Sequence, residues 1–202
     1  MKDTSVFAEK YESCLSKIRS LDVGSTMKGL AGTKHDQTVV FDFFNRRIAF
    51  NGHDFLDVTG CEVVPAVKFV LCNYILKSFD QKNTTSNNMV TFREFSNAGP
   101  LFSRFSENTG KIISTSFSGH VEQIKQRCQH LGATLLENPS YDLSAKFMAL
   151  DNVPIFLNYN DADDLMSANT VFLFHDDAES YLDLDGLAIV CTYLTGLLIQ
   201  GR

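Results

Sequence analysis

The chain of 202 residues contains no tryptophan and only five cysteines, and no two cysteines stand in a C-x-x-C arrangement. The odd number and the wide spacing of the cysteines are not those of a disulfide framework. A zinc or iron–sulfur site with four thiolates would require distant cysteines to converge. We therefore expect Cys72, Cys128 and Cys191, which fall within apolar helical patterns, to be small core residues.

Long basic runs and long apolar runs are also absent. The longest basic run is Arg46-Arg47, and the net charge is −6. Nucleic-acid-binding proteins and proteins bound to anionic membranes usually carry a basic patch, so the sequence predicts neither partner. The N-terminal segment lacks the apolar core of a signal peptide, and the most apolar stretch, residues 186–199, is too short to cross a bilayer. We expect a cytoplasmic protein.

Common catalytic and metal-binding signatures are missing as well. Residues 29–34, GLAGTK, lack the glycine spacing and the Lys-Ser/Thr pair of a phosphate-binding loop. Residues 115–119, TSFSG, lack the leading glycine of a nucleophile elbow. Calcium-binding EF-hand frames beginning at Asp161 or Tyr181 place no glutamate at position 12. The sequence therefore leaves the reaction, the cofactor and the metal unknown.

The chain does have the material for a sizeable core. Apolar residues make up 44% of it, including 17 phenylalanines, whereas charged residues make up 21%, too few for a disordered chain. At this length one domain over residues 1–202 is the expectation.

Helical and strand periodicities occur in separate blocks. Helical spacing predicts a helix over 4–20 and a second helix that begins at Pro65 and has an apolar face ending at Ile75. A third helix is predicted over 118–132 with Ser118 as N-cap, and a fourth at the C-terminus with Asp183 or Asp185 as cap. Strand patterns cover 38–44, 47–50 and 53–58, joined as a meander with a turn at Asn51-Gly52, and then 90–95, 141–150, 153–159 and 170–174. Residues 24–36 and 80–88 are predicted loops. Because strands and helices do not alternate, the pattern favours an α+β fold with a mainly antiparallel sheet and packed helices.

One acidic stretch contains the best candidate for a site, YNDADDLMSANTVFLFHDD at 159–177. Carboxylates with an imidazole suit a divalent ion or a general acid–base pair, whereas aspartates also commonly end strands and keep loops soluble. If the two flanking strands pair in parallel, both polar groups share one end of the sheet. If they pair antiparallel, the groups lie at opposite ends unless loop 160–169 folds back. The candidate ligand-binding residues are Asn160, Asp161, Asp163, Asp164, His175 and Asp176.

Residues 141–188, YDLSAKFMALDNVPIFLNYNDADDLMSANTVFLFHDDAESYLDLDGLA, resemble a family of anaerobic bacteria and archaea, domain of unknown function 3786. Residues 89–133, the helix near 66–78 and FFNRRIAF at 43–50 also fit this family, so the resemblance spans nearly the whole chain. In the family an acidic step precedes a Phe-Pro pair. Residues Asn160, Asp161, Asp163 and Asp164 match the step, whereas Leu165-Met166 stands in place of Phe-Pro and His175 replaces a commonly acidic residue.

The resemblance implies a metabolic context for the protein but no particular reaction. Some relatives carry an appended four-cysteine iron–sulfur domain of the kind found in corrinoid proteins of one-carbon metabolism, and this chain does not contain it. We expect an accessory or binding protein, linked to anaerobic one-carbon or corrinoid metabolism, with a protein partner or a small-molecule ligand. The sequence is also compatible with a homo-oligomer. The alternative is an enzyme that uses Asp161 and Asp163, with or without a divalent cation.

Overall fold

The computed structural model describes residues 2–20, 33–35, 38–79 and 86–201. These residues form an α+β structure with two antiparallel sheets, which confirms the predicted fold class. The chain divides into two compact units. Unit 1 comprises residues 1–85, 150–152 and 177–189, and unit 2 comprises residues 86–149, 153–176 and 190–202. The expectation of one domain over the whole chain stays a prediction.

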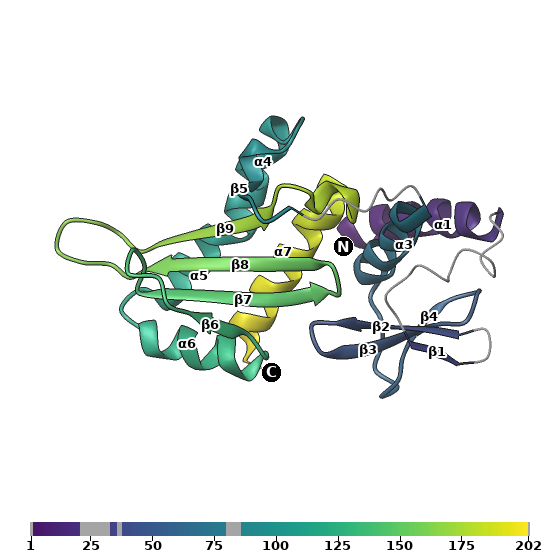
Figure 1. Ribbon diagram of the computed structural model, residues 1–202, viewed down its shortest axis with the longest axis horizontal. Helices are drawn as coiled ribbons and strands as arrows, with labels where there is room; N and C mark the ends of the chain where they lie inside the picture. Colours follow the sequence, from purple (N-terminus) through teal and green to yellow (C-terminus); the bar gives the residue numbers. More distant parts are fainter. Residues whose placement is uncertain (1, 21–32, 36–37, 80–85, 202) are drawn as a thin grey trace. The chain divides into compact units, whose positions relative to one another are not determined.

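The described residues of unit 1 include helices α1 (Lys2–Ser20) and α3 (Pro65–Phe79), a small sheet and the start of helix α7 (Leu184–Gln200) (Figure 1). Helix α1 packs against helix α3. The sheet has the order β1-β2-β3-β4, with strands Thr33–His35, Thr38–Phe43, Arg46–Phe50 and Phe55–Asp57. The meander predicted from 38 to 58 is thereby confirmed. Of the loop predicted at 24–36, residues 33–35 form strand β1, and the rest lie outside the described residues.

Aromatic and apolar side chains join the sheet of unit 1 to its helices. Phe55 contacts the rings of Tyr11 in α1 and Phe41 in β2, and Phe41 in turn contacts Tyr74 in α3. All four side chains are buried. The predicted apolar face of α3, from Val67 to Ile75, is buried as well. The chain turns at Asn51-Gly52 as predicted, and Gly52 adopts a φ of +86°, which glycine tolerates at little cost. Asn51 does not adopt a positive φ, and residues 51–54 together connect β3 to β4.

Unit 2 contains a five-stranded sheet with the order β5-β9-β8-β7-β6. The strands are Met89–Thr91, Thr134–Leu136, Leu143–Leu150, Val153–Asn160 and Asn169–His175, numbered β5 to β9 along the chain. The two apolar strands β8 and β9 lie inside the sheet, as their unbroken apolar runs predicted. Strand β5 is shorter than predicted, because a single 3-10 turn, Phe92–Glu94, follows it, and the Glu94 carboxylate accepts hydrogen bonds from the Thr91 backbone and side chain.

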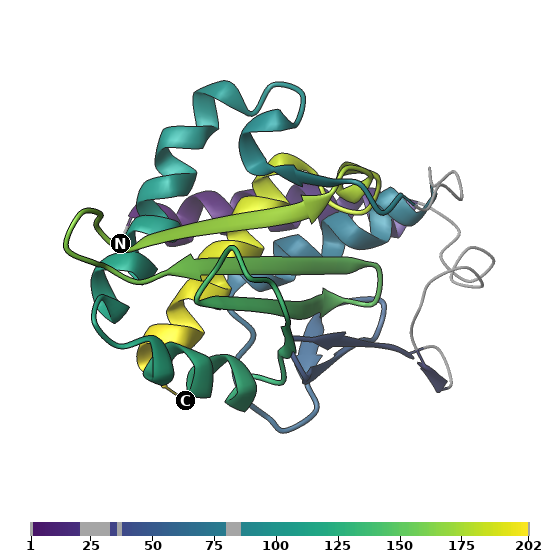
Figure 2. The same cartoon turned by 60° about the vertical axis from the view of Figure 1, so that its left-hand side comes forward.

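Three short helices precede strand β6, namely α4 (Gly99–Asn108), α5 (Gly110–Phe117) and α6 (Val121–His130). Helix α5 packs along β9, and in Figures 1 and 2 it lies on the same side of the sheet as the C-terminal part of helix α7 (Leu184–Gln200). Buried rings from the 3-10 turn, α4 and β9 form a phenylalanine cluster, made up of Phe92, Phe95, Phe105, Phe172 and Phe174.

Of the two predicted ends of α6, the structure contradicts the first and confirms the second. Ser118 does not cap α6, because it ends α5, and α6 begins only after His120. The predicted stop at Gly132 is confirmed, since Gly132 has a φ of +78° and donates to the Gln129 carbonyl while Ala133 donates to Cys128. These two bonds satisfy the last carbonyls of α6.

Helix α7 begins as predicted after Asp183, whose carboxylate accepts the Gly186 backbone N–H at 2.8 Å. The buried Asn73 side chain fixes this aspartate from α3, donating to its carboxylate and accepting from its backbone N–H, each at 2.9 Å. None of the described helices is long and apolar enough to cross a membrane.

The contact between α5 and β9 leads to a prediction. A Cβ atom on Gly110 would lie 2.8 Å from the Thr170 carbonyl oxygen, so the backbone must shift in a Gly110→Ala variant. We expect this variant to lose about 1–3 kcal/mol of unfolding free energy in denaturant titration. The matched control is Gly99→Ala at the first residue of α4, where a Cβ meets no atom within 4 Å. Equal stability of the two variants would contradict the tight contact.

Candidate functional site

The acidic stretch connects two antiparallel strands. Asn160 pairs with Asn169 at one end of the β8–β9 ladder, and Phe156 pairs with Leu173 further along. Residues 161–168 therefore form a loop that joins neighbouring strands, and both figures show it extending beyond the end of the sheet (Figures 1 and 2).

This pairing separates the candidate residues into two groups. Asn160, Asp161, Asp163 and Asp164 lie where β8 ends, whereas His175 and Asp176 lie where β9 ends. The backbone advances six residues along β9 from Asn169 to His175, which is about 20 Å at 3.3 Å per residue. The structure therefore does not bring Asp161 or Asp163 together with His175.

Asp161 is a structural carboxylate. Its Oδ1 accepts the backbone N–H groups of Gly119 at 2.6 Å and Ala162 at 2.8 Å. The hydroxyl of the fully buried Tyr159 lies 2.9 Å from the same oxygen and 2.8 Å from the Phe117 carbonyl oxygen, so its single proton is shared between these two acceptors. Desolvation raises the pKa of Asp161, but these hydrogen bonds together lower it further, so the net pKa lies below its usual value. The side chain stays ionised and ties the end of β8 to the turn that leads into α6.

Asn160 closes a second contact next to Asp161. Its side-chain carbonyl accepts the Asp142 backbone N–H at 3.0 Å, and the Asp142 carboxylate accepts the Asp161 backbone N–H at 2.8 Å. The two segments thus exchange hydrogen bonds just beyond the β7–β8 pair. Asn160 and Asp161 both act in holding this end of the sheet.

Asp163 shapes the loop itself. Its Oδ1 accepts the backbone N–H groups of Leu165 at 2.8 Å and Met166 at 2.7 Å, and its own N–H donates to the Met166 carbonyl at 2.9 Å. The hydrogen bonds from Leu165 and Met166 lower the pKa of Asp163. These three bonds make a closed turn around residues 163–166.

The turn presents two apolar side chains to solvent. Leu165 is 92% exposed and Met166 is 72% exposed, the two largest exposures among the large apolar residues described. We call this pair the hairpin tip. Sequence patterns did not identify it, because two apolar residues in an acidic loop carry no periodicity. Only the family resemblance had marked these positions, because it leads to the expectation of a Phe-Pro pair where Leu165-Met166 stands.

At the other end of β9, His175 and Asp176 face β5. His175 pairs with Met89 across the ladder, and its ring lies 5.4 Å from that of Phe156. The Asn88 side chain donates to the Asp176 carboxylate at 3.2 Å. Within the described part of the chain, no group of three or more His, Cys, Asp or Glu side chains is arranged to hold a metal ion.

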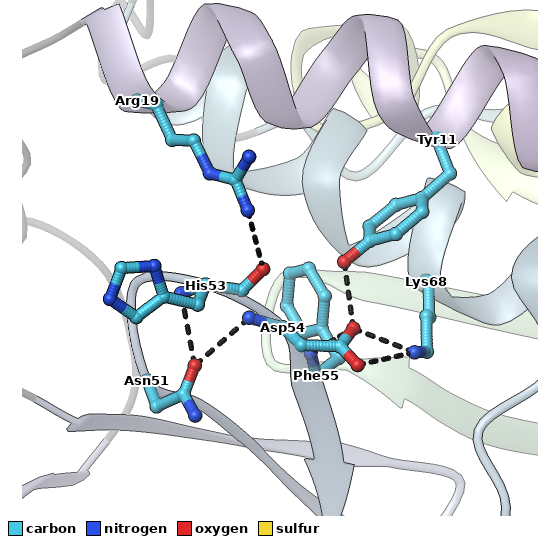
Figure 3. A network of polar contacts seen from close by, with 7 residues as sticks. All are labelled: Tyr11, Arg19, Asn51, His53, Asp54, Phe55 and Lys68. Atoms are coloured by element: carbon cyan, nitrogen blue, oxygen red, sulfur yellow. Dashed lines mark hydrogen bonds and ion pairs between the residues drawn. The ribbon is translucent and has the colours of Figure 1, made fainter.

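Unit 1 contains a polar network that the sequence patterns did not reveal (Figure 3). The Asp54 carboxylate accepts two hydrogen bonds from the Lys68 ammonium, at 2.6 and 2.7 Å, and one from the Tyr11 hydroxyl at 2.8 Å. The three residues come from the β3–β4 turn, α3 and α1. Nothing in their spacing along the chain could have predicted that they meet.

The turn that carries Asp54 is itself held in place. The Asn51 side chain accepts the backbone N–H groups of His53 and Asp54, each at 2.9 Å, and Arg19 of α1 donates to the His53 carbonyl at 3.1 Å (Figure 3). Desolvation raises the pKa of Asp54, but the bonds from Lys68 and Tyr11 outweigh it and leave the net pKa lowered. Burial and the bond to Asp54 raise the pKa of Tyr11. The network therefore holds a protonated phenol and an ionised carboxylate, which suits a structural clamp and not a catalytic base.

An ion pair with a buried carboxylate and a partly exposed guanidinium stabilises the same sheet. The Asp57 side chain is 2% exposed, and Arg46 donates to its Oδ2 from Nε at 3.0 Å and from Nη2 at 2.8 Å. Hydrogen bonds from Thr59 and Arg46 keep the pKa of Asp57 low despite its burial. Arg46 belongs to the FFNRRIAF segment, so this part of the family pattern has a structural explanation.

Comparison with known protein families gives a match over most of the chain. The family model described as "Domain of unknown function (DUF3786)" matches residues 22–196. The chain belongs to this family. No curated protein and no solved structure matches the DUF3786 chain. The family therefore brings no assigned reaction with it, and the association with iron–sulfur fusions and anaerobic metabolism stays a prediction.

The Asp161 contacts predict a pH-dependent stability. Because its folded pKa is lowered, Asp161 contributes stability above its unfolded pKa of about 3.9, and this contribution is lost as the pH falls through the folded value. We expect Asp161→Asn to cost about 1–2 kcal/mol at pH 7 and progressively less below about pH 4. Denaturant titrations across pH measure this difference.

The matched control for that variant is Asp164→Asn, which removes the same charge from an exposed position in the same loop. We expect it to leave stability unchanged at every pH. A similar loss in both variants, or a loss that does not vary with pH, would contradict the role of Asp161.

The network in unit 1 gives a further prediction. Tyr11→Phe removes one donor from a carboxylate and should cost about 1–2 kcal/mol of unfolding free energy. Tyr141→Phe is the control, because the Tyr141 hydroxyl has no hydrogen-bond partner among the described residues. Thermal and chemical unfolding of both variants compares the two hydroxyls directly. A clamp of this kind is ruled out if Tyr11→Phe unfolds like the control.

Proposed function

We propose that this chain acts by binding a protein partner as an accessory subunit. The single observation that carries the proposal is the hairpin tip, since Leu165 and Met166 expose their apolar side chains on a loop that is held closed by hydrogen bonds. A partner that covers these two side chains removes their apolar surface from water, and a fixed turn lowers the entropy lost on binding.

The polar residues support the same proposal. Asp161 and Asp163 direct their oxygens at backbone N–H groups of their own loop and of the turn before α6. A catalytic carboxylate needs an oxygen available to a substrate, a water or a metal. All of these bonds reach Oδ1, so the alternative enzyme would have Oδ2 of each carboxylate for its chemistry.

The setting of this function belongs to the proposal as well. We place the complex in the cytoplasm of an anaerobic cell and draw the partner from one-carbon or corrinoid metabolism. The metabolic setting rests on the family resemblance, and the cytoplasmic location rests on the sequence expectation alone.

The proposal predicts a stoichiometric heterocomplex. Tagged chain purified at native expression from its own cells should elute as a complex with a second, different protein, at a fixed ratio measured by native mass spectrometry. The two components, made separately and mixed, should then re-form the complex with a saturable dissociation constant. If the chain elutes alone and no component rebinds, the accessory function is wrong.

The enzyme alternative makes a different prediction. A divalent ion held by Asp161 and Asp163 at saturation should raise the unfolding free energy by a few kcal/mol. We expect thermal melts with Mg²⁺, Ca²⁺, Mn²⁺ or Zn²⁺ to match melts with a chelator. A stabilisation that disappears in an Asp161→Asn, Asp163→Asn double variant would favour the enzyme instead.

A further inference from the structure

The hairpin tip combines apolar and acidic groups in a fixed order. Leu165 and Met166 stand furthest into solvent, and Asp163 and Asp164 come directly before them. Asp163 stays ionised, because the N–H groups of Leu165 and Met166 lower its pKa. The turn therefore carries apolar and acidic residues side by side.

The combination of apolar and acidic residues in this loop favours some classes of binding partner over others. An apolar end alone would suit a lipid bilayer, but the carboxylates beside it would be brought against the anionic headgroups, which repel them. A nucleic acid is unfavourable for the same electrostatic reason. A protein pocket with apolar walls and lysine or arginine at its rim satisfies both parts of the loop, because the rim lies where the carboxylates arrive.

The turn is also built to hold its shape before binding. One oxygen of Asp163 accepts two consecutive backbone N–H groups, and the Met166 carbonyl accepts the Asp163 N–H. At the base of the loop, Asp161 is fixed to Gly119 and Tyr159. Leu165 and Met166 are thus displayed on a backbone whose conformation is set within the chain, as in other loops that insert one or two anchor side chains into a partner.

We infer that the loop 161–168 is the docking element of this chain, with Leu165 and Met166 inserting into an apolar pocket of a protein partner and Asp163 and Asp164 facing lysine or arginine at the rim of that pocket. This inference rests on the proposed accessory function and names the surface through which it works. Asp163 is a positioning residue here, since it acts through the turn as well as through its charge.

Site-specific photo-crosslinking tests the surface first. A benzophenone amino acid replaces Leu165 in one sample and Met148 in another, because Met148 is a 45% exposed apolar residue on strand β7 of the same unit. In cells that naturally produce the chain, illumination should join position 165, and not position 148, to one protein of a different sequence. The crosslinked peptide of that protein should contain apolar residues with a neighbouring lysine or arginine.

Titration of the crosslinked protein, purified and mixed with the chain, tests the chemistry. We expect Leu165→Ser and Met166→Ser each to weaken binding by about tenfold or more, as central anchor residues do. Asp164→Lys should slow association and remove most of its salt dependence. Met148→Ser should bind like the unmodified chain.

Two substitutions of Asp163 distinguish the effect of the turn hydrogen bonds on binding from the effect of the negative charge. Asp163→Asn keeps an acceptor oxygen for the two N–H groups, whereas Asp163→Ala removes it. The alanine variant should therefore bind several-fold more weakly than the asparagine variant, although both lack the carboxylate. Equal affinities would overturn the positioning role of Asp163.

The remaining outcomes distinguish this inference from the proposed function. A heterocomplex that crosslinks at 148 and tolerates Leu165→Ser overturns the docking loop while the accessory function stands. The absence of any heterocomplex overturns both. Crosslinking to a second copy of the chain, or Leu165-dependent binding to vesicles of equal parts phosphatidylcholine and phosphatidylglycerol, overturns the assignment of a different protein as partner.

Discussion

The antiparallel pairing of β8 and β9 is the constraint on which the candidate site depends. Because Asn160 faces Asn169, the chain reverses through residues 161–168, and the acidic step after β8 cannot share an end of the sheet with His175. The same reversal pushes Leu165 and Met166 beyond the last ladder pair. One pairing thus separates the groups that looked catalytic and creates the exposed tip that favours binding.

Aspartates recur through this structure as acceptors for backbone and side-chain donors. Asp161 and Asp163 serve the β8–β9 loop, Asp183 caps α7, and Asp54 joins two helices to a turn. In each case the carboxylate satisfies N–H groups that a strand end, a turn or a helix start leaves unpaired. A high density of aspartate is therefore compatible with an accessory protein and is weak evidence for a metal.

Local patterns recovered most of the elements. Apolar periodicity located α1, α3, α6 and α7, and unbroken apolar runs located β8 and β9 inside the sheet. Helices α4 and α5 were not predicted, because they follow each other directly and meet at Thr109, where the backbone leaves helical geometry, so no single apolar period runs through both. Strand β6, with three residues of which two are exposed, offered no alternation long enough to recognise.

The fold class, the family and the acidic step could be predicted from the order of residues, because helix and strand periods and a long ordered pattern are properties of neighbouring residues. Which polar groups meet depends on the fold. The direction in which β9 pairs with β8 separated Asp161 from His175, and the packing of α1 and α3 around a turn brought Tyr11 and Lys68 to Asp54. Residues distant in the chain approach one another through strand pairing and helix packing, and no spacing along the sequence records those contacts.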